Sequence, residues 1–231
     1  MTDHYRTAEQ LLLTPYDLTP GKLVSVFGTL FDHQVDYADL YFQYARSEAW
    51  SLEEGIVKSG SYSIDQGVGV RAVTGEKTAF AYSDDISLAA LQGAAQATRA
   101  IAASGQSARH AARLGKRKNR ALYSKLDPIP SLPDTEKVKL LERLESYARA
   151  LDPRVSEVMA HIAGSWEVVL IARSDGQMAA DVRPLVRVSI TVIMGEGERR
   201  EQGYAGGGGR YDYGYFSDER LRQYARDAVH H

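Results

Sequence analysis

The segment from Tyr62 to Asp85 constrains the fold most, because its glycines suggest one structure and its neighbours another. Gly67, Gly69 and Ala72 fit the G-x-G-x-x-G/A spacing of a dinucleotide-binding turn. That turn requires a following helix, so that backbone N–H groups can meet a pyrophosphate. Here the turn-forming run 74–77 and a second aromatic, strand-like run follow instead. The segment therefore predicts a β-hairpin and argues against a nucleotide site.

Composition excludes several classes of protein and site. The chain has 231 residues, 44% of them hydrophobic and 25% charged, which is typical of one or two globular domains. A formal net charge of −2 gives no general attraction to nucleic acid or to an anionic membrane. The absence of cysteine excludes disulfides, thiolate nucleophiles and thiolate metal sites. No apolar run approaches the ~18 residues of a membrane span, so we expect a soluble, cytoplasmic protein.

Capping residues and apolar stripes predict four helices. The first follows the cap and proline at 19–20, and the second starts near 83–85. The third is expected at 134–151, with Asp134 as its cap and a stop at 152–153. The fourth begins at 217–218.

Alternating and β-branched runs predict strands between these helices. They lie at 37–53, with a turn at 54–55, and at 155–163, 166–172 and 178–194, with turns at 164–165 and 175–176. Helices and hairpins occur in blocks. We therefore predict an α+β fold, in which an antiparallel, hairpin-rich sheet carries helices on one face and forms two layers.

The expected organisation is one domain followed by the start of another. Residues 1–104 form a helix and β-hairpin region, and 105–133, rich in glycine, proline and basic residues, form a connecting segment. Residues 134–216 add a helix and antiparallel strands to the same domain, and 217–231 begin a helix that leads out of it. The basic run at 116–120, with Tyr123 nearby, could contact nucleic acid, but a solvated loop explains it better because its neighbours are not basic.

No residue pattern supports catalysis or metal binding by this chain. A zinc hydrolase normally takes two histidines from one turn of a helix. No histidine has such a partner, and the adjacent His230 and His231 diverge on a helix and resemble a tag or a frayed end. No serine lies in a G-x-S-x-G turn. We therefore assign no catalytic residue and no metal ligand.

A glycine run near the carboxyl end is the first candidate for a contact surface. Glycine lets another backbone approach closely, so the run either binds an extended peptide or serves as a flexible connector. Valine at positions 207 and 208 is expected to weaken such contact more than folding. The candidate residues are Gly206, Gly207, Gly208, Gly209, Arg210 and Tyr211.

The final predicted helix supplies a second candidate surface. Its apolar stripe has no following element to cover it, and an uncovered apolar stripe usually marks an interface. The stripe consists of Leu221, Tyr224 and Ala228. It predicts self-association or a protein partner.

Several segments resemble the amino-terminal domain of the TldD/PmbA family, the "modulator of DNA gyrase" metalloproteases. They are the hairpin residues 65–71, 75–77 and 80–82, and the segments 39–43, 179–187 and 206–210, which agree with the TldD branch. The similarity extends from near residue 36 to the end of the chain.

The resemblance implies that this chain is the noncatalytic half of a zinc metalloprotease. Family members have a second domain with an H-E-x-x-x-H zinc motif completed by a distant cysteine, and this sequence contains neither. They act as TldD/PmbA heterodimers that admit extended peptides to an enclosed zinc site. This half would form chamber wall and subunit interface, with a TldD-type zinc domain and/or a PmbA-like subunit as partners and zinc bound in the other domain.

Two classes of function remain open at this point. The chain is either the accessory half of a zinc peptidase or a standalone module that binds peptides or partners without catalysis. A neighbouring reading frame that begins with the zinc domain would favour the first. We predict neither peptidase activity nor stoichiometric zinc from this chain alone.

Overall fold

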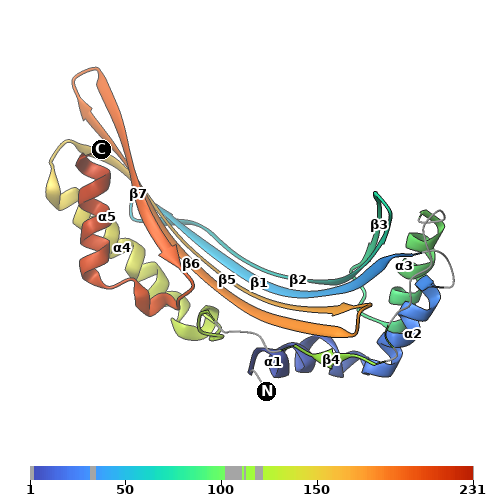
Figure 1. Cartoon of the computed structure of the whole chain (residues 1–231). Coiled ribbons are helices and arrows are strands. Elements are labelled where there is room, and N and C mark those ends of the chain that lie inside the picture. Colours follow the sequence, from blue (N-terminus) through green and yellow to red (C-terminus); the bar gives the residue numbers. More distant parts are fainter. Residues whose placement is uncertain (1–2, 32–34, 102–110, 112, 118–121, 231) are drawn as a thin grey trace. The chain divides into compact units, whose positions relative to one another are not determined.

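The computed structural model describes residues 3–31, 35–101, 111, 113–117 and 122–230. Within them it contains the helices α1 (Asp3–Leu12), α2 (Pro20–Phe31), α3 (Leu88–Ile101), α4 (Asp134–Leu151) and α5 (Asp218–His230) (Figure 1). The strands are β1 (Tyr37–Glu53), β2 (Ile56–Thr74), β3 (Lys77–Ser83), β4 (Gly115–Lys116), β5 (Val155–Arg173), β6 (Gln177–Glu196) and β7 (Arg199–Gly209). The predicted α+β class is confirmed.

The strands form one sheet in the order β3-β2-β1-β5-β6-β4, and β7 also pairs with β6. The β2/β3 and β6/β7 pairs are antiparallel, whereas the short β4 runs parallel to β6. Contacts divide the chain into two compact units. Unit 1 comprises Met1–Ala45, Ile64–Leu122 and Glu167–Val182, and unit 2 comprises Arg46–Ser63, Tyr123–Trp166 and Arg183–His231.

Unit 1 packs its helices against alternate residues of its strands. Leu40 and Phe42 of β1 and Val70 of β2 are fully buried, as are Phe27 of α2 and Leu91 of α3. The intervening strand residues lie on the opposite face, because side chains alternate along a strand. One face of this part of the sheet is therefore core, and the other is available for contacts.

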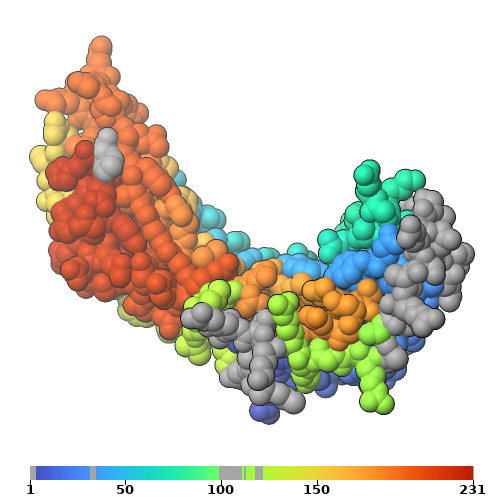
Figure 2. Space-filling view, in the orientation of Figure 1, coloured from blue at the N-terminus to red at the C-terminus, as the bar shows by residue number. Residues whose placement is uncertain are grey.

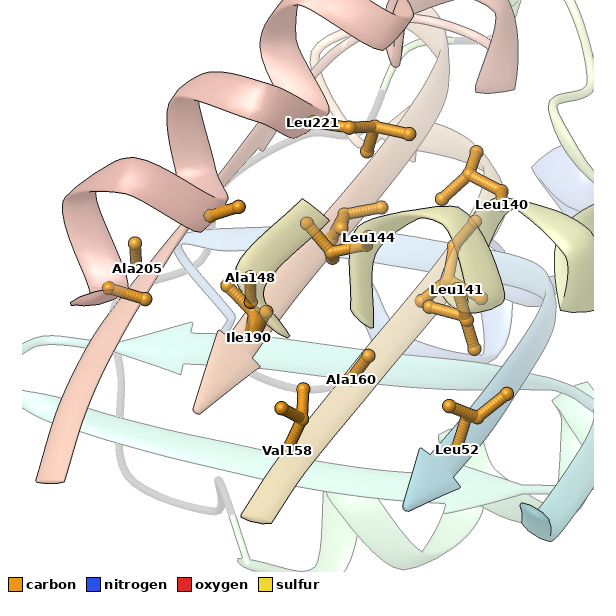
Figure 3. Close-up of a cluster of buried hydrophobic side chains, with 14 of the residues drawn as sticks. Leu52, Leu140, Leu141, Leu144, Ala148, Val158, Ala160, Ile190, Ala205 and Leu221 are labelled. Atoms are coloured by element: carbon orange, nitrogen blue, oxygen red, sulfur yellow. The ribbon is translucent and has the colours of Figure 1, made fainter. Parts of the chain in front are cut away.

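Unit 2 has its own core between α4, α5 and the sheet. Leu144 of α4 and Leu221 of α5 are fully buried together with Ile190 of β6 (Figure 3). Val158 and Ala160 place the inner face of β5 in the same cluster. The alternating apolar residues of the predicted 178–194 strand form one wall of this core from Val186 to Val192.

Several predicted boundaries agree with the structure. The strand at 37–53 and the helix at 134–151 have the predicted bounds. The 74–77 segment turns the β2/β3 hairpin with Gly75 at φ +56°, and Gly176 turns from β5 to β6 at φ +89°. Positive φ explains glycine at these two turns. A hairpin, not a helix, thus follows Gly67 and Gly69.

The predicted turn at 164–165 is wrong. Strand β5 runs without a break from Val155 to Arg173. Gly164 lies under the ring of Tyr213, whose hydroxyl oxygen is 2.1 Å from the position that a Cβ on Gly164 would occupy. The glycine makes room for a side chain from elsewhere in the sequence, and a local pattern cannot distinguish that role from a turn.

One helix is absent from the sequence-based expectations, and one predicted cap is wrong. The sequence pattern predicts no helix at Asp3–Leu12, where α1 lies. Asp134 is the first residue of α4 and not its cap, because Pro133 occupies the cap position and the Asp134 carboxylate accepts a hydrogen bond from Lys137. Residues 105–110, 112 and 118–121 of the predicted connecting segment lie outside the described residues, as do His33 and His231.

Within the part of the chain that the structure describes, no helix combines the length and the apolar character needed to cross a membrane.

Candidate peptide and partner contact surface

The glycine run is part of a strand. Gly206 to Gly209 form the end of β7 and pair with residues 186–189 of β6. The alternative of a flexible connector is therefore wrong. Among the described strands β7 pairs with β6 alone, so its other edge belongs to no further ladder. An unpaired edge can accept an extended chain through backbone hydrogen bonds.

One face of β7 is used by α5. A Cβ on Gly203 would lie 1.8 Å from the carbonyl oxygen of Ala228, and a Cβ on Gly207 would lie 2.5 Å from the hydroxyl of Tyr224. Glycine therefore allows the helix to approach the strand closely. Figure 2 shows the red atoms of α5 directly against the orange atoms of the β6/β7 hairpin. Gly207 serves packing inside the chain.

The other two central glycines lie close to the backbone of β6. A Cβ on Gly206 would lie 2.5 Å from the carbonyl oxygen of Val188, and one on Gly208 would lie 1.9 Å from that of Val186. Valine at 207 and 208 would meet atoms of unit 2, so the double substitution is expected to affect folding as well as contact.

The face of β7 opposite α5 is polar next to these glycines. Arg187 Nη2 donates a hydrogen bond to the hydroxyl of Tyr204 at 2.8 Å, and this bond lowers the pKa of Tyr204. Tyr204 is 52% exposed. This face therefore offers both a cation and an aromatic ring beside a backbone without side chains.

Arg210 and Tyr211 follow the strand and are partly occupied within the chain. Arg210 Nη1 donates to the carbonyl oxygen of Pro184 at 3.1 Å, and its guanidinium lies 5.4 Å from the ring centroid of Tyr123. The ring of Tyr211 stacks on Tyr215 with centroids 4.4 Å apart. One donor of the Arg210 guanidinium is therefore already used within the chain.

A shallow hollow of about 200 Å³ lies beside these residues. Leu126 and Tyr211 line it and are 59% and 53% exposed. Exposed apolar side chains around a hollow are typical of a contact site for another molecule. We call this feature the Leu126/Tyr211 hollow.

The predicted interface stripe on the last helix is not uncovered. Leu221 and Ala228 are 0% and 1% exposed and belong to the core of unit 2. Burial also raises the pKa of Tyr224, which packs on the same cluster. Helix α4 and strand β7 cover the stripe, and sequence alone could not show that these distant segments would meet there (Figure 3).

Unit 2 also contains a buried polar network that the sequence analysis missed. Lys137 Nζ lies 2.7 Å from Glu48 Oε1 and donates to the carbonyl oxygen of Ile129 at 3.0 Å. The hydroxyl of Tyr213 donates to the same carboxylate at 2.7 Å, and burial followed by this bond raises the pKa of Tyr213. The network joins β1, the 123–133 segment, α4 and the turn after β7.

Unit 1 contains a second hollow, of about 290 Å³, on the sheet face opposite its helices. It is lined by Asp65, Gly67, Gly69, Phe80, Tyr82 and Asp84, together with Tyr41, Gln43 and Gln66. These residues come from β1 and the β2/β3 hairpin and the turn after it. The segment from Tyr62 to Asp85, whose pattern argues against a nucleotide site, thus lines a surface hollow instead.

The described residues do not fit a zinc centre. They contain no group of three or more His, Cys, Asp and Glu side chains that could hold a metal ion. No reaction step through zinc can therefore be placed on these residues.

Two family profiles and a curated relative match this chain. The profile of "PmbA/TldA metallopeptidase domain 1" matches residues 38–102, and that of "PmbA/TldA metallopeptidase central domain" matches residues 127–231. A "Metalloprotease TldD homolog" of Haemophilus influenzae is 44% identical over 224 residues, which cover 94% of this chain and 46% of that protein. The chain thus spans about half the length of this relative.

Solved structures agree on the fold. A Thermotoga maritima protein described as a candidate modulator of DNA gyrase has a TM-score of 0.70 at 14% identity, over 90% of this chain and 47% of that one. TldE from Thermococcus kodakarensis has a TM-score of 0.64 at 15% identity, over 90% and 46%. The two successive profile matches and the relative's identity lead to one conclusion: the chain belongs to the PmbA/TldD metallopeptidase family.

Proposed function

We propose that this chain is the noncatalytic half of a TldD-type zinc metallopeptidase, forming chamber wall, subunit interface and a contact surface for extended peptides. One observation carries the proposal: domain 1 and the central domain match in order, within a TldD relative of which this chain covers 46%. The zinc ligands and the catalytic residues would then lie in the remainder of the protein. The helix at 217–231 would lead toward that remainder.

The peptide contact is proposed for β7. Its edge is unpaired among the described strands, and Gly206 and Gly208 carry no side chains that would hold a second backbone away. Main-chain pairing would bind small unfolded proteins with little regard for sequence. Gly207 and Gly209 contribute to the shape of the strand and not to this contact.

The partner is proposed to be a PmbA-like subunit, in a cytoplasmic heterodimer. The shared fold with TldE supports a second subunit of the same architecture. The Leu126/Tyr211 hollow, with Arg210 at its side, is the surface of unit 2 that we assign to protein contact. It replaces the stripe on α5, which is buried within the chain.

Assembly with the missing half tests the proposal. The chain would be co-expressed with the part of the H. influenzae relative that lies outside the matched region, and the product would be examined by size-exclusion chromatography with light scattering. We expect a complex with one copy of each. The H. influenzae protein split at the same place is the positive control. If the two halves of the H. influenzae protein combine but this chain does not bind the co-expressed half, the proposal is wrong.

A further inference from the structure

We propose that the hollow on the open face of unit 1 binds a lysine or arginine side chain of an extended polypeptide. We name it the aromatic-acidic hollow and define it by Asp65, Gly67, Gly69, Phe80, Tyr82 and Asp84. The inference refines the peptide capture of the proposed function. It does not depend on assembly or on cleavage, because every residue belongs to this chain.

Two exposed aromatic rings form one wall of the aromatic-acidic hollow. Phe80 and Tyr82 are 56% and 75% exposed, and their rings stack with centroids 6.3 Å apart at an angle of 22°. Both lie on β3, whose atoms are at the surface of the molecule (Figure 2). Ring faces attract a cation held over them. Large rings left in water are therefore suited to a cationic side chain with an apolar stem.

Glycines shape the floor. A Cβ on Gly69 would lie 2.7 Å from the ring of Phe80, and a Cβ on Gly67 would lie 2.7 Å from the carbonyl oxygen of Ser83. The register places Gly69 opposite Tyr82, so Phe80 leans diagonally across the strand pair onto the glycine. Any side chain at these two positions would fill the hollow or displace its wall. The hollow therefore depends on glycine at both positions.

The charges of the hollow are complementary to a cation. Asp65 and Asp84 are exposed, and neither forms an ion pair or a side-chain hydrogen bond within the described residues. The described lining contains no lysine or arginine. By contrast, Asp39 on the same face is paired with Arg71, and Asp36 accepts a hydrogen bond from the backbone N–H of Gly75. Asp65 and Asp84 therefore keep their carboxylates available to a ligand in the hollow.

The size and remaining polar groups favour a polypeptide over a free amine or a metal ion. About 290 Å³ is more than one lysine side chain fills, which leaves space for its main chain. The amides of Gln43 and Gln66 are each used once within the chain, because Gln43 Nε2 donates to Glu167 at 2.7 Å and Gln66 Oε1 accepts from Tyr16 at 3.3 Å. The Gln43 carbonyl oxygen and the Gln66 amide N–H groups can still meet a peptide group. Two carboxylates without a third ligand do not make a metal site among the described residues.

Binding of short labelled peptides to the whole 231-residue chain tests this inference. Fluorescence anisotropy would compare a decapeptide of alternating lysine and serine with one in which norleucine replaces lysine. We expect the lysine peptide to bind about tenfold more tightly at low salt, and this difference to shrink as salt is added. Asp65→Asn with Asp84→Asn should weaken the lysine peptide about tenfold and leave the norleucine peptide unchanged.

Two further variants separate the site from general charge. Tyr82→Ala should weaken the lysine peptide severalfold, because it removes one ring face. Glu76→Gln removes one exposed charge from the same hairpin but outside the hollow, and it should change nothing. Thermal unfolding checks that every variant is folded.

The inference is overturned if the parent chain does not bind the lysine peptide or binds both peptides equally. It is also overturned if Glu76→Gln weakens binding as much as the double variant does. Neither result bears on whether the chain assembles with a zinc-binding half, so the two proposals fail separately.

Discussion

Lys137 shows how a single charged residue can be accommodated in the core of unit 2. Its side chain is 1% exposed, and its ammonium group contacts Glu48, Asp134 and the carbonyl oxygen of Ile129. An ammonium group has three donors, and three acceptors surround it. The arrangement satisfies the charge and holds the 123–133 segment against α4.

Removing this ammonium group should be costly. We predict that Lys137→Met lowers the free energy of unfolding by about 3–5 kcal/mol, because it leaves the Glu48 carboxylate buried beside only the Tyr213 hydroxyl. Urea unfolding followed by circular dichroism measures the change. Lys139→Met is the matched control, since Lys139 lies on the same helix in an exposed pair with Glu136 and its loss should leave the urea midpoint nearly unchanged. Equal losses would contradict the account of the network.

Gly164 provides a second prediction about a single residue. Gly164→Ala should destabilise the chain by about 1–3 kcal/mol, because the new methyl group needs the space of the Tyr213 hydroxyl. The control is Gly28→Ala in α2, where an added Cβ meets no atom within 4 Å and should stabilise the helix by about 0.5–1 kcal/mol. Thermal unfolding of both variants would show shifts of opposite sign. A stabilising Gly164→Ala would mean that the ring is not seated there.

Helix α5 packs closely on strand β7, and the two glycines at this contact face different obstacles. The obstacle to a side chain at Gly203 is the backbone of α5, at the carbonyl oxygen of Ala228, whereas the obstacle at Gly207 is the outer end of the Tyr224 side chain. A side-chain end can move more easily than a helix backbone. The two glycines should therefore differ in their tolerance of substitution.

We predict that Gly203→Ala lowers the melting temperature more than Gly207→Ala does. Adding Tyr224→Phe to Gly207→Ala should restore part of the loss, because it removes the hydroxyl at 2.5 Å. The same Tyr224→Phe change should not help Gly203→Ala. Equal losses at both glycines, or rescue of both by Tyr224→Phe, would show that α5 does not pack on β7 in this way.

The elements that could be predicted from the sequence were those with a purely local cause. Strand β1 ends at a Glu54-Gly55 turn, and α4 has a strong apolar stripe, so local signals predict their bounds. The local pattern predicts a turn at Gly164, whereas the glycine is needed for close contact with Tyr213, which lies 49 positions later in the sequence. Local patterns carry no information about such partners.

The candidate site was predictable to a similar degree. The 206–211 segment was identified as unusual, but its strand pairing and the role of Gly207 depend on β6 and α5. The α5 stripe was read as exposed because its covering elements are distant in sequence. The aromatic-acidic hollow forms only when β1 and the β2/β3 hairpin lie side by side.

At the scale of the whole molecule, membership in the PmbA/TldD family and coverage of about half of the H. influenzae relative define the central claim. Under the proposed function, the chain would supply structure and contacts, and the remainder of the protein would supply the metal chemistry. The described residues contain no group of three or more metal-ligating side chains, and the proposal places zinc binding in the other half.

The most direct test measures zinc content and peptide cleavage for the chain alone, for the other half of the H. influenzae relative alone, and for the two together. Zinc would be determined by mass spectrometry after removal of any tag, and cleavage would be followed with an unfolded peptide such as casein fragments. We predict cleavage by the mixture only, with one zinc per complex and loss of activity on chelation. One tightly held zinc on this chain alone, together with chelator-sensitive cleavage by it, would contradict the account.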